Sequence, residues 1–284
     1  MPFANYLELL KLRIGGMIAL TAVVSYLAMA ERVSLSHLFW LTLVMLLGSA
    51  SSAVFNHWYD RDIDRIMERT AHRPLAQRAL NGSNHVLWLA GLLLLAGVSI
   101  SVWLFNPIVA VHLFLGAFFY GVVYTVWLKR RTWLNIVLGG LAGSFAVMAG
   151  AASVNPGLCA LPILLALVLF FWTPSHFWSL AIHLKEDYQK AGVPMLPVVV
   201  GEQKAARYIF LNSMLLVGAS LLPWYFGQLG KLYLAGALLS GSLFLFENWR
   251  LIRTPTREMG WRNFLGSMRY LGVLFLAIVA DVTF

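Results

Sequence analysis

The chain has 284 residues, of which 60% are hydrophobic and only 12% are charged, and its formal net charge is +9. An ordinary soluble domain carries roughly twice that charged fraction. The long, nearly uncharged apolar runs therefore exclude this class and indicate helices that span a bilayer. The basic residues lie in short segments between the runs, which is typical of membrane topology and not of nucleic-acid binding. Hence we expect an all-α integral membrane protein in contact with the lipid bilayer, with no nucleic-acid partner.

Nine membrane spans are predicted along the chain. The first follows Lys11 and Arg13 and ends in an A-x-A triplet, a pattern that secretory signal peptides share. Its apolar run is longer than a typical signal core, so a retained helix is the favoured interpretation. The single cysteine, Cys159, lies inside an apolar run and excludes a disulfide framework. The predicted spans are 14–30, 37–55, 85–105, 108–127, 133–151, 158–182, 206–226, 231–249 and 268–284.

Basic residues are distributed unevenly between the two sides of the membrane. With a cytoplasmic N-terminus, 19 of the 21 basic residues fall on the cytoplasmic side, and only Arg32 and Lys231 face the other side. This asymmetry follows the positive-inside rule. Most acidic residues share it, which indicates a polar site there; the alternative is a solvated loop of mixed charge. The cytoplasmic basic residues are Lys11, Arg13, Arg61, Arg65, Arg69, Arg73, Arg78, Lys129, Arg130, Arg131, Lys185, Lys190, Lys204, Arg207, Arg250, Arg253, Arg257, Arg262 and Arg269.

The second span ends in the pattern NxxxDxxxD, formed by Asn56, Asp60 and Asp64. At about 100° per residue, the three side chains spread over only ~80° of one helical face. Two carboxylates one turn apart repel each other unless a cation lies beside them. Oxygen ligands without cysteine suit Mg²⁺, so these residues are candidate metal ligands and catalytic residues. Asp62 points to the opposite face and is expected to be solvated or paired with an arginine.

Arginines crowd the end of this pattern and the segment that follows it. Five lie within 18 residues, among them Arg65, Arg69 and Arg73, and guanidinium groups bind phosphate oxygens well. Lys129, at the cytoplasmic end of the fourth span, is placed to reach the same anion, although an ordinary topogenic lysine needs no such role. Carboxylates for a metal ion beside cations for phosphate predict a diphosphate substrate.

A second polar cluster, with Lys185 and Asp187, follows the sixth span. An even number of spans separates the two clusters, so both lie on one side, and together they could hold two metal ions on one diphosphate. His176, His183 and Asp187 share one helical face to within ~20°, with Trp172 about one turn above. Such side chains usually face the interior of a bundle. The alternative for each histidine is a hydrogen bond to a neighbouring helix.

Taken together, these residues resemble the UbiA superfamily of intramembrane prenyltransferases. NxxxDxxxD followed by RTAHRP (69–74) marks the superfamily. Three further stretches resemble the branch that farnesylates haem, and the similarity runs from about Lys11 to the last span. These stretches are YTVWLKRRT (124–132), WTPSHFWSLA (172–181) and DYQKAGVPMLP (187–197).

The resemblance implies a fold and a reaction. The fold is a single transmembrane domain, 1–284, with nine helices around a central cavity, in the cytoplasmic (inner) membrane of a bacterium and with its site facing the cytoplasm. The reaction transfers a farnesyl group from farnesyl diphosphate to a vinyl group of haem b, adds water, and uses Mg²⁺. An association with a haem-modifying enzyme or an oxidase assembly is a further expectation.

The resemblance also implies roles for individual residues. Imidazole is a good iron ligand and can hydrogen-bond a propionate, so the two histidines suit a haem acceptor. The segment 185–204 would act as a lid over the site. The metal ligands and catalytic residues would be Asn56, Asp60, Asp64 and Asp187. The diphosphate would be bound by Arg65, Arg69, Arg73, Lys129 and Lys185, and the haem by His176, His183 and Trp172.

The sequence departs from the family pattern at one place, and two alternative functions remain open. After Gly140 the chain reads LAGSFAVMAG where many relatives have a Pro-Pro turn, which leaves the path of the fifth span open. The same donor site would serve a prenyltransferase acting on a quinone precursor or a chlorophyll-like ring. A transporter is disfavoured, because ion-coupled transporters place ionisable residues at the bilayer midplane, whereas the acids here gather at one side.

Overall fold

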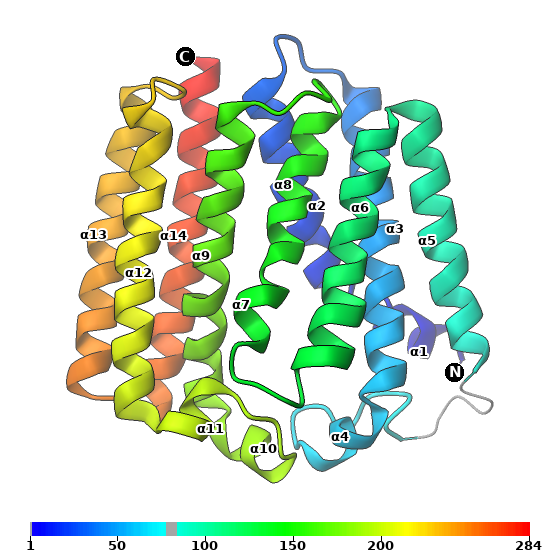
Figure 1. Cartoon of the computed structure of the whole chain (residues 1–284), viewed down its shortest axis with the longest axis vertical. Coiled ribbons are helices and arrows are strands. Elements are labelled where there is room, and N and C mark those ends of the chain that lie inside the picture. Colours follow the sequence, from blue (N-terminus) through cyan, green and yellow to red (C-terminus); the bar gives the residue numbers. More distant parts are fainter. Residues whose placement is uncertain (1, 78–83) are drawn as a thin grey trace.

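The structure is a computed structural model that describes residues 2–77 and 84–284, with side chains from residue 4 onwards. Every described element is helical, which confirms the predicted all-α class. Long helices run side by side along the vertical axis of Figure 1. The N-terminal half contains α1 (Pro2–Leu9), α2 (Leu12–Met29), α3 (Leu35–Tyr59), α4 (Arg61–Ile66), α5 (His85–Leu104), α6 (Pro107–Phe118), the π-helix η1 (Phe119–Leu128), α7 (Asn135–Gly139) and α8 (Leu141–Ala152). The C-terminal half contains α9 (Ala160–His183), α10 (Lys185–Lys190), α11 (Leu196–Val200), α12 (Glu202–Tyr225), α13 (Lys231–Arg253) and α14 (Arg257–Thr283).

Eight of the nine predicted spans are confirmed, within the described residues, as segments long and apolar enough to cross a membrane. Two of these segments combine elements, because α6 continues into η1 and α7 into α8. The remaining predicted span, 231–249, corresponds to α13, which has 23 residues and runs beside α12 and α14 in Figure 1. It is not among these eight segments, and its C-terminal part contains Glu247 and Asn248. The fifth span is interrupted at Gly140 even without a Pro-Pro turn.

The last predicted span, 268–284, is the C-terminal part of a longer helix. The helix α14 begins at Arg257, because the hydroxyl of Thr256 accepts a hydrogen bond from the backbone N–H of Met259 at 3.3 Å and caps the helix. The added turns are polar in sequence, yet one face of them, with Gly260 and Asn263, is buried. Asn263, only 1% exposed, donates from Nδ2 to Ser179 Oγ at 2.8 Å.

The early start of α14 also corrects the location of Arg269. This residue lies within α14 and not in a loop before it. Its guanidinium pairs with Glu247 of α13 at 2.5 Å. The pair links α13 to α14 at the surface of the bundle, with the Glu247 side chain the less exposed partner.

Small residues allow the helices to approach closely. A Cβ atom at Gly150 in α8 would collide with the backbone of Ala22 in α2, so the two helices pack backbone against backbone there. The largest apolar cluster joins α2, α8, α9, α12, α13 and α14. The first predicted span is thus an integral part of the bundle.

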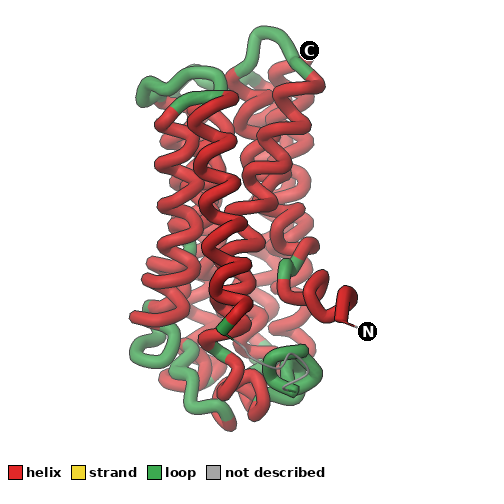
Figure 2. The backbone as a smooth tube through the Cα atoms, turned by 90° about the vertical axis from the view of Figure 1, so that its right-hand side faces the viewer, coloured by secondary structure: helices red, strands yellow, loops and turns green. Residues whose placement is uncertain are grey.

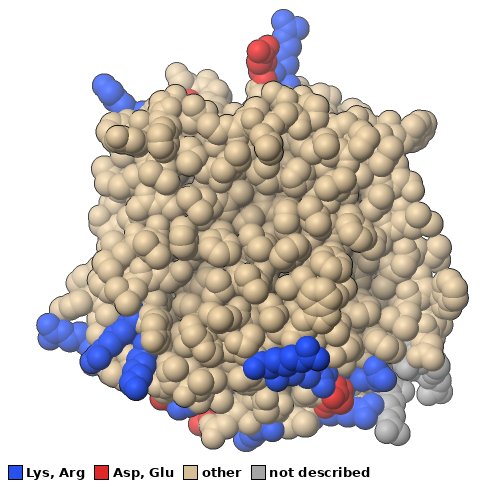
Figure 3. Space-filling view, in the orientation of Figure 1, with Lys and Arg blue, Asp and Glu red and all other residues tan. Residues whose placement is uncertain are grey.

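Charged side chains gather at one end of the bundle. The helices α4, α10 and α11 lie together at the bottom of Figure 1, as expected for two polar clusters on one side. Lys, Arg, Asp and Glu are concentrated at that end in Figure 3, and few are visible at the opposite end. We refer to it as the charged end; Arg78 lies outside the described residues. Near this end α1 turns away from the bundle axis (Figure 2), and Leu9 is buried against Val54 and Leu75.

Candidate active site

The candidate metal ligands lie where α3 passes into α4 at the charged end. The backbone N–H of Asp60 donates to Asn56 O (2.9 Å) and that of Asp64 donates to Asp60 O (2.8 Å), so the helical spacing continues across the junction. Asn56, Asp60 and Asp64 are only 3%, 0% and 1% exposed. The structure therefore buries one amide and two carboxylates on adjacent turns, as the sequence pattern predicts.

Asp60 is surrounded by hydrogen-bond donors. Its Oδ2 atom accepts from Lys129 Nζ at 2.5 Å and from Asn56 Nδ2 at 2.7 Å, while Oδ1 lies 3.5 Å from Arg130 Nη2. Lys129 is itself buried, with 7% exposed surface. A buried carboxylate of this kind is stable only with such partners. Lys129 thus contacts Asp60 directly, and its contact with a diphosphate stays a prediction.

Asp64 is held by the arginine-rich segment that follows it. Arg73 Nη1 donates to both carboxylate oxygens of Asp64, at 2.9 and 2.8 Å. The hydroxyl of Thr70 donates to the backbone oxygen of Asp64 at 3.0 Å, which fixes the loop between them. Of the predicted arginines, Arg73 is therefore the one that turns back into the site.

Lys11 belongs to the same group, although its position before the first span predicted only a role in topology. Its ammonium donates to Asn56 Oδ1 at 2.7 Å. The residue has φ 46°, and no other non-glycine residue among those described has a positive φ. This backbone conformation turns the chain between α1 and α2 and directs the side chain inward. Burial, followed by the charges of Arg73 and Lys129, lowers the pKa of Lys11.

The π-helix η1 completes the wall of the site. The backbone N–H of Lys129 donates to Tyr124 O, five residues back, at 2.8 Å. Thr125 Oγ1 donates to Tyr120 O at 2.8 Å and accepts from Asn56 Nδ2 at 3.0 Å. π-Helical segments often occur at functional sites because they redirect side chains. The amino-acid composition of this segment does not indicate a π-helix, and Thr125 was not among the predicted site residues.

Asp62 lies outside this group, in agreement with its predicted orientation. Arg130 donates from Nη1 and Nη2 to the two carboxylate oxygens of Asp62, both at 2.7 Å. These hydrogen bonds hold the pKa of Asp62 below its ordinary value. The predicted pairing with an arginine is confirmed, and the partner comes from the loop after η1.

Two other candidate anion-binding residues, Arg65 and Lys185, are engaged elsewhere. Arg65 Nε donates to Ala76 O at 2.6 Å, and Lys185 pairs with Glu202 at 2.7 Å. Asp187 accepts hydrogen bonds from the backbone N–H groups of Glu68 (3.4 Å) and Arg69 (3.3 Å), which ties the loop after α4 to α10. Among the described residues, no three His, Cys, Asp or Glu side chains form a metal-binding group. Asp187 therefore does not join Asp60 and Asp64 in this structure.

The candidate haem-binding residues form a stack between α9 and α14. The ring of His176 lies between Trp172 and Phe264, with centroid distances of 4.2 and 4.4 Å. His176 Nδ1 lies 2.7 Å from Ser267 Oγ, and Trp172 Nε1 donates to Ser267 O at 2.8 Å. Nearer the charged end, His183 Nδ1 lies 3.2 Å from the backbone oxygen of Arg257. Both histidines thus hydrogen-bond a neighbouring helix, which was the alternative interpretation.

The donor chemistry of the buried group fits Mg²⁺. Asn56, Asp60 and Asp64 offer only oxygen ligands, and Mg²⁺ binds to proteins through one or two carboxylates plus water and phosphate oxygens. Lys129 and Arg73 stand beside these carboxylates at 2.5 and 2.8 Å. Cations in contact with each carboxylate show that the site requires positive charge, which a metal ion would also supply.

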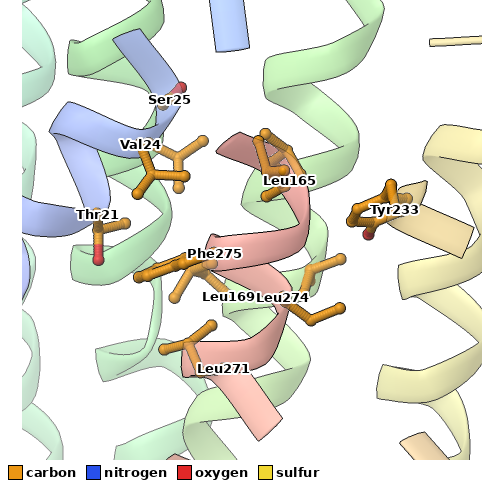
Figure 4. A pocket seen from close by; sticks show the side chains of 12 residues that line it. Thr21, Val24, Ser25, Leu165, Leu169, Tyr233, Leu271, Leu274 and Phe275 are labelled. Carbon is orange, nitrogen blue, oxygen red and sulfur yellow. The ribbon is translucent and has the colours of Figure 1, made fainter. Parts of the chain in front are cut away.

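A small apolar cavity lies farther from the charged end, between α2, α9 and α14 (Figure 4). Leu165, Leu169, Leu271 and Phe275 contribute hydrocarbon surface to its lining. Ser25 is one of its few polar members. Its volume of about 10 Å³ has room for no more than about one water molecule, so it is a packing gap and not a substrate pocket.

Known proteins are similar to this sequence over almost its whole length. The sequence pattern of the UbiA prenyltransferase family matches residues 17–278. Protoheme IX farnesyltransferase 1 of Paramagnetospirillum magneticum is 55% identical over 281 residues, which cover 99% of each chain. Protoheme IX farnesyltransferase of Granulibacter bethesdensis is 36% identical over 98% of this chain and 90% of its own.

Solved structures share the fold. A structure from work on digeranylgeranylglyceryl phosphate synthase superposes with a TM-score of 0.81 at 20% identity, over 99% of this chain and 98% of the other. A UbiA homolog from Archaeoglobus fulgidus, bound to DMAPP and Mg²⁺, superposes with a TM-score of 0.71 at 17% identity, over 97% and 99%. The fold, the sequence match and the full-length relatives agree: this chain belongs to the UbiA prenyltransferase family.

Proposed function

We propose that this chain is a Mg²⁺-dependent protohaem IX farnesyltransferase. It transfers the farnesyl group of farnesyl diphosphate to a vinyl group of haem b and adds water to give haem O. The shared name of its relatives, at 55% and 36% identity over nearly the full length, supports the acceptor. The observation that carries the donor half is the buried group of Asn56, Asp60 and Asp64 with cations against it.

Bound Mg²⁺ would neutralise charge on the diphosphate and make it a better leaving group. Asn56, Asp60 and Asp64 would hold the ion. We keep Asp187 as a further candidate ligand, because its present hydrogen bonds to backbone N–H groups are long, at 3.3 and 3.4 Å. It lies on α10, within the segment that we infer to be a lid, and Gly192 (φ 65°) and Gly201 (φ 78°) provide flexible points there.

The cations of the chain would stabilise the leaving group. As the bond between C1 of the farnesyl group and the phosphate oxygen breaks, its electron pair goes to the diphosphate, near Lys129, Arg73 and Lys11. C1 bonds to the terminal vinyl carbon, and the adjacent carbon becomes cationic. Water adds to that carbon and releases a proton, which balances the reaction. The apolar bundle shields the cation from earlier attack by water.

The haem would lie along α9, toward Trp172 and His176. Because Nδ1 of His176 contacts Ser267, Nε2 is the nitrogen that would reach the iron, and His183 would orient the acceptor. Haem titration of His176→Ala and His183→Ala, followed by visible absorption, tests this assignment. We expect weaker haem binding with unchanged diphosphate affinity; parent-like haem binding in both variants would make these histidines packing residues.

We further infer that the charged end faces the cytoplasm of a bacterial cell, in the inner membrane. The decisive experiment for the function is mass spectrometry of haem extracted from membranes with and without the expressed chain. Haem O should appear only in membranes that contain the expressed chain. The purified chain should form haem O from haem b and farnesyl diphosphate when Mg²⁺ is present, and a chelator should abolish this activity. If the chain farnesylates an aromatic acid or a chlorophyll-like ring but does not farnesylate haem b, the proposal is overturned.

A further inference from the structure

His57, the residue after Asn56, takes no part in the mechanism above. Its side chain is only 1% exposed. Neither Nδ1 nor Nε2 has a hydrogen-bond partner among the described residues. Buried polar atoms are nearly always paired, and leaving one unpaired destabilises the fold. A histidine in this condition therefore calls for a partner that protein side chains do not provide.

The position of His57 points to the donor site. Asp64 follows it by seven residues, so the two lie on nearly the same helical face, and the helical hydrogen bonds through Asp60 carry this spacing across the junction. Three cations, Lys11, Arg73 and Lys129, lie near enough to His57 to affect its ring electrostatically. These same cations contact Asn56, Asp64 and Asp60. His57 thus lies beside the group of side chains that would receive the donor's anionic end.

The local charge favours an anion with many oxygen atoms. Three cations face only two buried carboxylates in this group. A neutral imidazole carries one N–H donor, and hydrogen bonds to phosphate oxygens are stronger than those between neutral groups. We propose that His57 donates a ring N–H hydrogen bond to the diphosphate of the prenyl donor and so helps to position it for ionisation. This inference rests on the proposed function of the site, and it concerns a side chain that the NxxxDxxxD pattern leaves unspecified.

Packing alone makes a different prediction. If His57 only fills space, an apolar residue of similar size should fit better and leave diphosphate binding unchanged. If it binds the donor, the same substitution should preserve or raise the thermal stability of the unliganded protein, because an unpaired polar group is removed. It should also weaken diphosphate binding. The two readouts therefore separate the roles.

The test uses the full-length protein in nanodiscs and inorganic diphosphate with Mg²⁺ as the probe. Parent, His57→Leu, His57→Met and His57→Gln are compared by thermal unfolding and by equilibrium binding. We expect both apolar variants to bind diphosphate about ten- to a hundredfold more weakly, the range for one charge-assisted hydrogen bond. Glutamine retains an N–H of similar reach and should recover at least part of this affinity.

A matched control lies at the opposite end of the same helix. His37 in α3 has a partner, because its Nε2 lies 2.9 Å from Ser153 Oγ. His37→Leu should lower the thermal stability and leave diphosphate affinity unchanged. Parent-like affinity in either His57→Leu or His57→Met overturns the inference. Formation of haem O by the parent is measured separately, so an inactive parent that still binds diphosphate would refute the haem assignment and not the role of His57.

Discussion

The pair formed by Asp60 and Lys129 can be dissected by a double-mutant cycle. The two side chains are 0% and 8% exposed, and Nζ lies 2.5 Å from Oδ2. Asp60→Asn preserves shape but leaves the buried ammonium of Lys129 without this carboxylate. Removing one partner of a buried ion pair costs about 3–5 kcal/mol. Lys129→Met should cost less, about 1–3 kcal/mol, because Asn56 and Arg130 still face Asp60 at 2.7 and 3.5 Å.

The double variant should separate stability from catalysis. Asp60→Asn with Lys129→Met removes both charges, so no buried charge is left uncompensated and the two losses should not add. The expected coupling is about 1–3 kcal/mol, the range for residues in direct contact. Activity should not recover, because the proposed metal ligand and the proposed diphosphate ligand are both lost.

The assay is thermal unfolding of purified protein combined with product analysis. For a chain of this size, 1 kcal/mol shifts Tm by about 2–4 °C. Asp60→Asn should therefore lower Tm by roughly 6–20 °C, and the double variant should regain a large part of that loss while forming no haem O. Additive losses of stability would refute the buried pair, and near-normal turnover in Asp60→Asn would refute the metal site.

The topology and a second ion pair offer further predictions. In a Cys159→Ser background, an impermeant thiol reagent applied to intact cells should label Gly157→Cys and not Arg131→Cys. The opposite labelling pattern would show that the charged end faces away from the cytoplasm. Both positions are exposed. The loop after α8, which holds Gly157, and the loop before α7, which holds Arg131, lie at opposite ends of the bundle in Figure 1. Glu247→Gln or Arg269→Met should each destabilise the protein by about 0.5–2 kcal/mol, with most of the loss recovered when both are changed. Independent effects in the denaturation midpoints would show that this pair is not coupled.

Hydrophobicity predicted the spans wherever the apolar run is unbroken, and it failed where polar residues face a neighbouring helix. The start of α14 looks like a cytoplasmic loop because of its polar sequence, yet Asn263 bonds to Ser179 and Ser267 to His176 within the bundle. A hydropathy window weighs only the residue type. It cannot register that a polar side chain is satisfied by a partner on another helix.

The site shows a similar division between local and distant information. The alignment of Asn56, Asp60 and Asp64 follows from helical spacing alone, so the sequence predicted it correctly. Lys11 reaches Asn56 from 45 residues away in the chain, and its approach depends on how α1 and α2 pack. Lys185 was grouped with the site by its neighbours in sequence, but its ammonium pairs with Glu202. Periodicity predicts which side chains share one face of a helix, but it does not predict which other helix packs against that face.

Thr125 provides a test of how η1 supports the metal site. Its hydroxyl is fully buried and accepts from Asn56 Nδ2 at 3.0 Å while it donates to Tyr120 O at 2.8 Å. Thr125→Val keeps the branched shape and removes both hydrogen bonds, which should cost about 1–3 kcal/mol. Asn56 would then be held by fewer partners, and losing an outer partner of a metal ligand lowers metal affinity about tenfold or more. The Mg²⁺ concentration for half-maximal activity should rise accordingly, whereas Thr125→Ser, which retains the hydroxyl, should stay close to the parent. If Thr125→Val lowers Tm but leaves the Mg²⁺ dependence unchanged, η1 stabilises the bundle without orienting Asn56, and the metal would have to be held without that amide.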